Sequence, residues 1–239
     1  MRTLSIGNSF SEDATRYIHK IARADGKRVN TANLYIGGCS LERHYNNMLS
    51  GDRVYELQYN GENTHFFVSL EEALENREWD IVTLQQVSGR SFDKSSYYPY
   101  INEICDFVRK KAPSAKIYIH ETWAYENGSE RLARLGRFES ARDMTDAVVN
   151  TYKEIAAEIG AHGIIPSGEL FGMLAESSAD AKIHRDTYHA SLGLGRYALG
   201  LLWYHTLLGA SVSENSFCDF DEPISENNIA LVKKLVDNM

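Results

Sequence analysis

The 239-residue chain is predicted to form one doubly wound α/β domain, in which helices cover both faces of a parallel sheet. Short runs rich in Ile and Val recur along the chain, as is typical of strands that are buried on both faces. Longer segments with apolar residues at helical spacing separate these runs. No repeat and no Pro-, Gly- or Ser-rich linker interrupts the sequence, so residues 1–239 are expected to form a single domain.

The first half of the chain alternates predicted strands and helices. Its strands are apolar runs that end at glycine or polar residues, at positions 3–6, 29–36 and 79–84. Its helices carry apolar side chains on one face, at positions 11–24 and 70–76. The turn-forming pair Asn60-Gly61 separates two further runs, 54–59 and 65–68, which predicts a small β-hairpin inserted into the domain.

The second half continues the alternation. Residues 100–111 are predicted to be helical because their apolar side chains recur every three or four residues, and Pro113 ends this helix. Strands are predicted at 116–120 and 163–165, which brings the parallel sheet to about five strands. A polar segment, 123–137, lies between them. The other helices are predicted at 140–159, 169–177, 192–208 and 229–236.

Charge and cysteine content exclude several classes of protein. The chain has 25 Lys and Arg against 33 Asp and Glu, a net charge of −8, whereas nucleic acids and anionic membranes select basic surfaces. We therefore expect neither as a partner. Three widely spaced cysteines without a C-x-x-C pair fit a reducing compartment. Because no run of 18 apolar residues occurs and the apolar start is too short for a signal peptide, a cytoplasmic location is expected.

The first candidate for chemistry follows the first strand. Ligands of doubly wound domains bind outside the carboxyl ends of the strands, and Gly7-Asn8-Ser9-Phe10-Ser11 lies there, just before a predicted helix. A serine at this position is near the positive end of the helix dipole, which stabilises negative charge on a nearby oxygen. The alternative is that Ser9 or Ser11 only caps the helix. The pattern matches neither G-x-S-x-G nor a phosphate-binding loop.

The second candidate is Asp186-Thr187-Tyr188-His189, which precedes a long apolar helix. A carboxylate and an imidazole three residues apart can meet within a turn. The carboxylate then orients the imidazole, whose other nitrogen accepts the proton of a serine nucleophile. On its own, an Asp-x-x-His pair is more often a surface or capping feature.

Together these motifs resemble those of the SGNH, or GDSL-like, hydrolase superfamily. The segment at 7–11 is similar to the family's first block, the Ile-Gly-Gly-Cys-Ser segment at 36–40 to its second, and Asp-x-x-His at 186–189 to its fifth. The resemblance covers nearly the whole chain and keeps the order of the blocks. It implies a three-layer α/β/α, flavodoxin-like fold.

The resemblance also implies roles for individual residues. Ser9 would be the nucleophile, His189 the general base and Asp186 the residue that orients it. The backbone N–H groups of Ser9 and Gly38 would bind the oxyanion. Such an enzyme is a serine esterase that works by two-step acyl transfer without an organic cofactor.

The third block departs from the family pattern, which is Gly-x-Asn-Asp with the Asn side chain as a third oxyanion donor. This chain has Leu-Gln-Gln-Val-Ser-Gly at 84–89. A glutamine amide can donate the same hydrogen bond from a longer stem, so we expect Gln85 at the strand end to do so, with Gln86 and Ser88 as alternatives. The first block differs too, because Asn8 replaces the acid. Both changes indicate a divergent branch.

The substrate is the least constrained feature. Since no H-x-x-x-H or H-E-x-x-H pair occurs, no metal is expected. The polar segment at 123–137 favours a saccharide ester over a lipid, and Trp123 is the candidate for contact with the sugar, although packing is an equal alternative. We therefore expect a small-molecule or saccharide ester and removal of an acetyl group. The alternatives are an aryl- or thioesterase, or a non-catalytic flavodoxin-like domain that binds a small ligand.

Overall fold

The computed structural model describes residues 1–177 and 182–239. At its centre is a seven-stranded sheet in the order β4-β3-β2-β1-β5-β6-β7. The strands are β1 (Arg2–Gly7), β2 (Asn30–Tyr35), β3 (Tyr55–Tyr59), β4 (Glu62–Val68), β5 (Ile81–Leu84), β6 (Lys116–His120) and β7 (Gly163–Ile165). Strands β2, β1, β5, β6 and β7 pair in parallel. The predicted α/β class, with a five-stranded parallel sheet, is confirmed.

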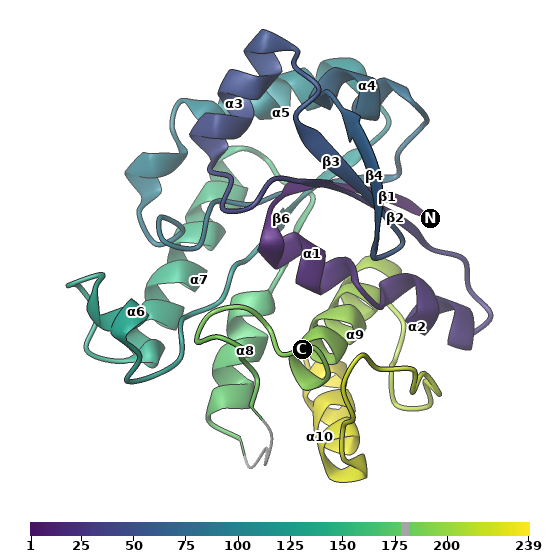
Figure 1. The fold of residues 1–239 in the computed structure, drawn as a ribbon, viewed down its shortest axis with the longest axis vertical. Helices are drawn as coiled ribbons and strands as arrows, with labels where there is room; N and C mark the ends of the chain where they lie inside the picture. The colour runs from purple at the N-terminus through teal and green to yellow at the C-terminus, as the bar shows by residue number, and fades with distance from the viewer. Residues whose placement is uncertain (178–181) are drawn as a thin grey trace.

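Helices cover both faces of this sheet (Figure 1). They are α1 (Ser9–Thr15), α2 (Ile18–Ala24), α3 (Leu41–Ser50), α4 (Leu70–Glu75), α5 (Tyr100–Lys111), α6 (Glu130–Ala133), α7 (Ala141–Glu158), α8 (Ser167–Ala175), α9 (Leu194–Leu208) and α10 (Glu226–Asp237). Apolar side chains of α3, α4, α5 and α7 bury one face, and those of α1, α2, α8, α9 and α10 bury the other. In the described part of the chain, no helix is long and apolar enough to cross a membrane.

The predicted hairpin forms and becomes part of the sheet. Strand β3 pairs antiparallel with β2 over Ala32–Tyr35, and β4 then forms the edge. The turn contains Asn60 and Gly61, both with positive φ. Gly61 is required there because a Cβ at this position would clash with the backbone of Arg16. The hairpin is therefore an antiparallel extension of the parallel sheet.

The structure differs from the predicted helices in three places, one of which is the short α6 inside the segment expected to be polar and irregular. The helix expected at 11–24 is divided into α1 and α2, because side chains at the break bind distant segments: the Tyr17 hydroxyl donates to the Leu192 carbonyl, and the Arg16 guanidinium binds Asp221. Helix α3 was not predicted, since most of its residues are polar and only two of them are buried. Its caps, Ser40 and Gly51, were present in the sequence.

Candidate active site

The first turn of α1 presents the Ser9 hydroxyl. Asn8 is the N-cap: its Oδ1 accepts from the Phe10 N–H at 3.0 Å, and the Ser11 Oγ accepts from the Asn8 N–H at 3.0 Å. Ser11 therefore completes a capping box, whereas Ser9 is the first helical residue and takes no part in the cap. The alternative in which Ser9 only caps the helix is excluded by this geometry.

The structure brings together Ser9, His189 and Asp186. The Ser9 Oγ lies 2.8 Å from His189 Nε2, and His189 Nδ1 lies 2.7 Å from Asp186 Oδ2. Asp186 Oδ1 also accepts from the backbone N–H of His189 at 2.9 Å. Between them, Thr187 has a φ of +73°, and in this turn the carboxylate reaches both the backbone nitrogen and Nδ1 of His189.

The protonation of this cluster follows from its contacts. Partial burial raises the pKa of the Asp186 carboxyl, but hydrogen bonds from the His189 side chain and backbone outweigh this effect and lower it. An ionised carboxylate can only accept, so Nδ1 of His189 must donate to it. In the neutral imidazole Nε2 is then the acceptor, and it faces the Ser9 hydroxyl.

The loop after β2 lies beside Ser9. Asn8 connects the two, because its Nδ2 donates to the Cys39 carbonyl at 3.0 Å. Gly38 is exposed and has a φ of +62°, a conformation that favours glycine. Within residues 1–177 and 182–239, the backbone N–H groups of Ser9 and Gly38 donate to no other group. These two donors are therefore free to bind an oxygen atom of a ligand.

The residues after β5 differ in what their side chains can still donate. Both ends of the Gln86 amide already have hydrogen-bond partners. Its Oε1 accepts from the N–H groups of Leu41 and Val87, and its Nε2 donates to Ser96. The Ser88 hydroxyl shares one hydrogen bond with Tyr125. Gln85 donates one amide hydrogen to Asn8 Oδ1 at 2.8 Å. Its second amide hydrogen has no partner among the residues that the structure describes, so it stays available.

A buried hydrogen-bond chain continues behind Gln85. The Gln85 Oε1 accepts from His120 Nδ1 at 2.8 Å, and His120 Nε2 in turn accepts from the Ser167 hydroxyl at 3.1 Å. Burial lowers the pKa of His120 to about 3, so this imidazole stays neutral. These hydrogen bonds run from Ser167, after β7, through His120 at the end of β6 and Gln85 after β5. They end at Asn8, the N-cap of α1. Sequence reasoning missed His120, although it is the last residue of a predicted strand.

Glu121, the next residue, is a buried acid at the N-terminus of α8. Its Oε2 accepts from the N–H groups of Gly168 and Glu169, while its Oε1 has no hydrogen-bond partner within the described ranges. Burial raises the pKa of Glu121 to about 8. The folded state therefore holds a proton that the unfolded chain, with its ordinary value of 4.5, releases at neutral pH.

We expect Glu121→Gln to remove a pH dependence of stability. Because the folded pKa lies above the unfolded one, the wild type should lose stability as the pH rises from about 4.5 to about 8. The variant should lose less of its Tm over that range and exceed the wild type at pH 9 by about 5 °C or more. Calorimetry at pH 5, 7 and 9 measures this, with Glu154→Gln on the surface of α7 as the control. Parallel Tm curves for wild type and Glu121→Gln would contradict it.

The prediction for Trp123 is wrong. Its side chain is 0% exposed and stacks on Phe171, with ring centroids 4.5 Å apart, and on Phe10. Its indole N–H donates to the Tyr188 carbonyl at 2.8 Å. Trp123 therefore supports the segment that carries His189 from within the core and contacts no substrate. An aromatic residue at a strand end gives no sequence signal that separates packing from binding.

Tyr188 is the aromatic residue that lies beside the catalytic candidates instead. Its ring centroid lies 3.8 Å from that of His189, and the guanidinium of Arg131, on α6, lies 3.5 Å from the Tyr188 centroid. Beside them is a cavity of about 550 Å³. It is lined mostly by polar and charged residues: Tyr125, Glu130, Arg131, Arg134, Leu135 and Thr187. Thr187, which lies between Asp186 and His189, lines this polar cavity, whereas Ser9, Asp186 and His189 do not.

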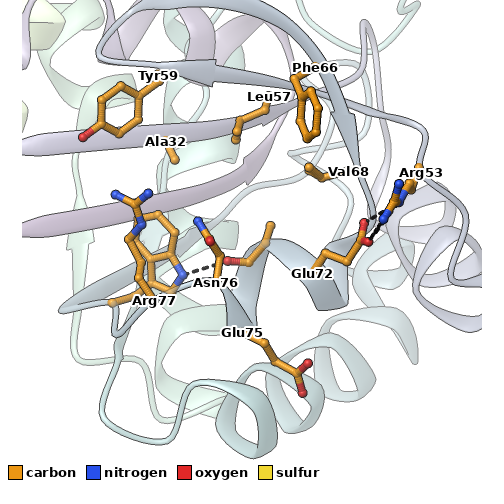
Figure 2. A pocket seen from close by; sticks show the side chains of 12 residues that line it. Ala32, Arg53, Leu57, Tyr59, Phe66, Val68, Glu72, Glu75, Asn76 and Arg77 are labelled. Atoms are coloured by element: carbon orange, nitrogen blue, oxygen red, sulfur yellow. Dashed lines mark hydrogen bonds and ion pairs between the residues drawn. The ribbon is translucent and has the colours of Figure 1, made fainter.

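A separate apolar cavity of about 420 Å³ lies under the β3–β4 hairpin (Figure 2). Leu57, Phe66 and Val68 face it from the hairpin. Glu72 faces it from α4, and Asn76 from the C-cap of that helix. Trp79, which precedes β5, also lines it, so the cavity is displaced from the carboxyl ends of the strands. None of the predicted site residues belongs to it.

Comparison with known proteins places these features in a family. A family model described as "Domain of unknown function (DUF4886)" matches residues 2–234. The crystal structure of a DUF4886 family protein from Bacteroides uniformis is similar over 100% of this chain and 93% of that chain, with 30% identity and a TM-score of 0.92. No curated protein matches the sequence.

Two further structures share the fold. A protein from Slackia heliotrinireducens assigned to the SGNH hydrolases is 26% identical over 87% of this chain and 98% of its own, with a TM-score of 0.63. An acetyl xylan esterase is 12% identical over 87% of this chain and 100% of its own, with a TM-score of 0.54. The fold is that of the SGNH hydrolases, so the resemblance found in the sequence is confirmed.

Proposed function

The chain belongs to the DUF4886 family and has the fold of the SGNH hydrolases, and from this premise we propose that it is a serine ester hydrolase. The observation that carries the proposal is the row of contacts Asp186–His189–Ser9, at 2.7 and 2.8 Å. A carboxylate that fixes the tautomer of an imidazole, which in turn accepts from a serine hydroxyl, is the arrangement that activates serine as a nucleophile.

The reaction would proceed in two steps. Ser9 Oγ attacks the ester carbonyl carbon while His189 Nε2 accepts the hydroxyl proton, and the resulting oxyanion accepts from the N–H groups of Ser9 and Gly38. The intermediate collapses, and the alcohol leaves with the proton from His189. Water then attacks the acyl-Ser9 ester while His189 accepts one of its protons. As the bond between the acyl carbon and Ser9 Oγ breaks, His189 returns that proton to Oγ, and the carboxylic acid leaves with Ser9 free.

Labelling with a fluorophosphonate tests the proposal directly. The reagent phosphonylates an activated serine and spares a passive one, so mass spectrometry should find a single adduct on the peptide that contains Ser9. A protein that hydrolyses p-nitrophenyl acetate and carries this adduct is a serine hydrolase. A protein that shows neither is a non-catalytic domain of the same fold, which is the second function that the sequence allows.

We propose a saccharide that carries an acetyl ester as the substrate. The cavity beside Tyr188 supports this choice, because arginine, glutamate and threonine side chains suit a ligand rich in hydroxyl groups. The Arg131 guanidinium, which lies over the Tyr188 ring beside His189, can donate hydrogen bonds to sugar hydroxyl groups. A panel of acetylated sugars, aryl acetates and acetyl thioesters tests the assignment. A higher kcat/KM for the sugars supports it, and preference for either other class overturns it.

Gln85 is proposed as the third oxyanion donor, and Gln85→Ala is expected to lower kcat by about 10²- to 10³-fold with little change in KM. The physical reason is that its remaining amide hydrogen would bond to an oxygen that is negative only in the transition state. Kinetics with p-nitrophenyl acetate measure the effect, with Ser88→Ala as the matched comparison. An unchanged kcat in Gln85→Ala together with a reduced kcat in Ser88→Ala would move the role to Ser88.

A further inference from the structure

Asp13 is a buried charge on the helix that carries Ser9. It lies four residues after Ser9 on α1, one helical turn away, and its side chain is 0% exposed. A carboxylate without water needs several hydrogen-bond donors to remain in such a place. Its donors come from a distant segment of the chain, the one that contains Asp186 and His189.

Four hydrogen bonds reach the Asp13 carboxylate. Arg185 Nη1 lies 2.9 Å from both oxygens, and Arg196 Nε lies 2.9 Å from Oδ1. The backbone N–H of Ala190 donates to Oδ2 at 3.2 Å. Burial raises the pKa of the Asp13 carboxyl, and the two guanidinium groups oppose that shift. The contacts to Arg185 and Ala190 matter most here, because these residues directly precede and directly follow the Asp186–His189 turn.

The turn itself is closed by its own backbone. The Arg185 N–H donates to the His189 carbonyl at 3.0 Å, and the Ser191 N–H donates to the Ile183 carbonyl at 2.8 Å. Arg185 also donates through its guanidinium to the Ala190 carbonyl. The segment is therefore a small rigid unit whose two ends meet. One carboxylate holds both ends against α1.

We propose that Asp13 is a positioning residue, which holds His189 at hydrogen-bond distance from Ser9 by clamping both ends of the Asp186–His189 turn to the helix of the nucleophile. This inference rests on the proposed serine chemistry. Because Ser9 and Asp13 share one helix, and His189 lies between the two residues that Asp13 holds, a shift of the turn would lengthen the contact between Ser9 Oγ and His189 Nε2. Misplacement of reacting groups by about 1 Å costs about 10²-fold in rate.

The same ion network contains a matched control. Arg196 also binds Asp221, and Asp221 binds Arg16, which follows the last residue of α1 and also contacts Glu62. Arg16 therefore belongs to the same charged cluster as Arg185, but no contact joins it to the Asp186–His189 turn in the described part of the chain. Arg185→Gln and Arg16→Gln remove the same charge from the two ends of one network.

The experiment compares Arg185→Gln with Arg16→Gln in steady-state kinetics, with Tm measured for both. Arg185→Gln should lower kcat for p-nitrophenyl acetate by about 10- to 100-fold while KM stays within about twofold. Arg16→Gln should lower Tm but leave kcat within about twofold. Arg185→Lys, which keeps the charge beside Asp13, should recover part of the lost kcat. An unchanged kcat in Arg185→Gln, or an equal loss in Arg16→Gln, would overturn the proposal.

A second readout separates this inference from the proposed function. Amide hydrogen exchange of residues 186–190 needs no substrate, and it should become faster in Arg185→Gln than in the wild type and Arg16→Gln. If the wild type hydrolyses no ester but exchange responds in this way, the ester hydrolase proposal fails and the clamp stands. If exchange in this segment is the same in all three proteins, the clamp is wrong.

Discussion

Ser9→Ala is expected to reduce kcat for p-nitrophenyl acetate by about 10⁴- to 10⁶-fold and to abolish labelling by a fluorophosphonate. The reason is that the Ser9 hydroxyl oxygen is the atom that would form the acyl ester. His189 lies behind that hydroxyl, so its imidazole is not placed to attack the ester in its stead. The fold should survive, because the Ser9 side chain takes no part in the helix cap that Asn8 and Ser11 form.

Ser11→Ala is the control for this experiment, since it makes the same change two residues away. The Ser11 hydroxyl donates to Asn33 Oδ1 and accepts from the Asn8 N–H, so its loss should cost about 1 kcal/mol of stability. Labelling of Ser9 should persist in that variant. Retention of full activity in Ser9→Ala, with an unchanged Tm, would show that another residue is the nucleophile.

Asp186→Asn is expected to lower kcat by about 10³- to 10⁴-fold while the side chain keeps its shape. The carboxylate accepts from both the backbone N–H and the Nδ1 of His189. In the amide, Oδ1 can still accept from the backbone, which turns the NH₂ group toward Nδ1. The imidazole must then carry its proton on Nε2, the nitrogen that has to accept from Ser9.

Kinetics and NMR together check this prediction. Steady-state rates give the loss of kcat, and the imidazole ¹⁵N shifts of His189 report which nitrogen is protonated. Glu126→Gln, which removes an acid from the loop that borders the same turn, is the control and should leave both readouts unchanged. A variant Asp186→Asn with wild-type kcat, or with its proton still on Nδ1, would contradict the orienting role.

The parts of the site that could be predicted are those that depend on local sequence. Asp186 and His189 are three residues apart, and one turn brings them together. Ser9 lies two residues after the end of β1, where the rule for the carboxyl ends of parallel strands predicts a ligand site. Apolar periodicity reveals the order of strands and helices in which both motifs lie, but each motif was weak alone, and it was their joint resemblance to the SGNH hydrolases that suggested the roles. Helix α3 could not be found in this way, because so few of its residues are buried that its apolar pattern is short.

The features of the site that could not be predicted are those in which residues of the same type take different roles, or in which residues distant in the sequence meet. Gln85 and Gln86 are neighbours of the same type, and only their surroundings show that Gln86 is fully bonded while Gln85 keeps a free amide hydrogen within the described residues. Trp123 and Tyr188 are both aromatic residues near the site, and only packing shows that the first is core. Asp13 and Arg185 are 172 positions apart, so no local pattern connects them.

By itself, the sequence determined the α/β class and most of the order of its elements, and its resemblance to the SGNH hydrolases pointed to Ser9, Asp186 and His189. The class and the order follow from local periodicity and from the chain direction of each strand, which act within a few residues. Only the tertiary structure decided which glutamine can still donate, which aromatic ring is buried, and that one buried carboxylate joins the helix of Ser9 to the turn that contains His189. Hydrogen-bond partners across the fold are selected by distance and burial, and both arise only when the whole chain has packed.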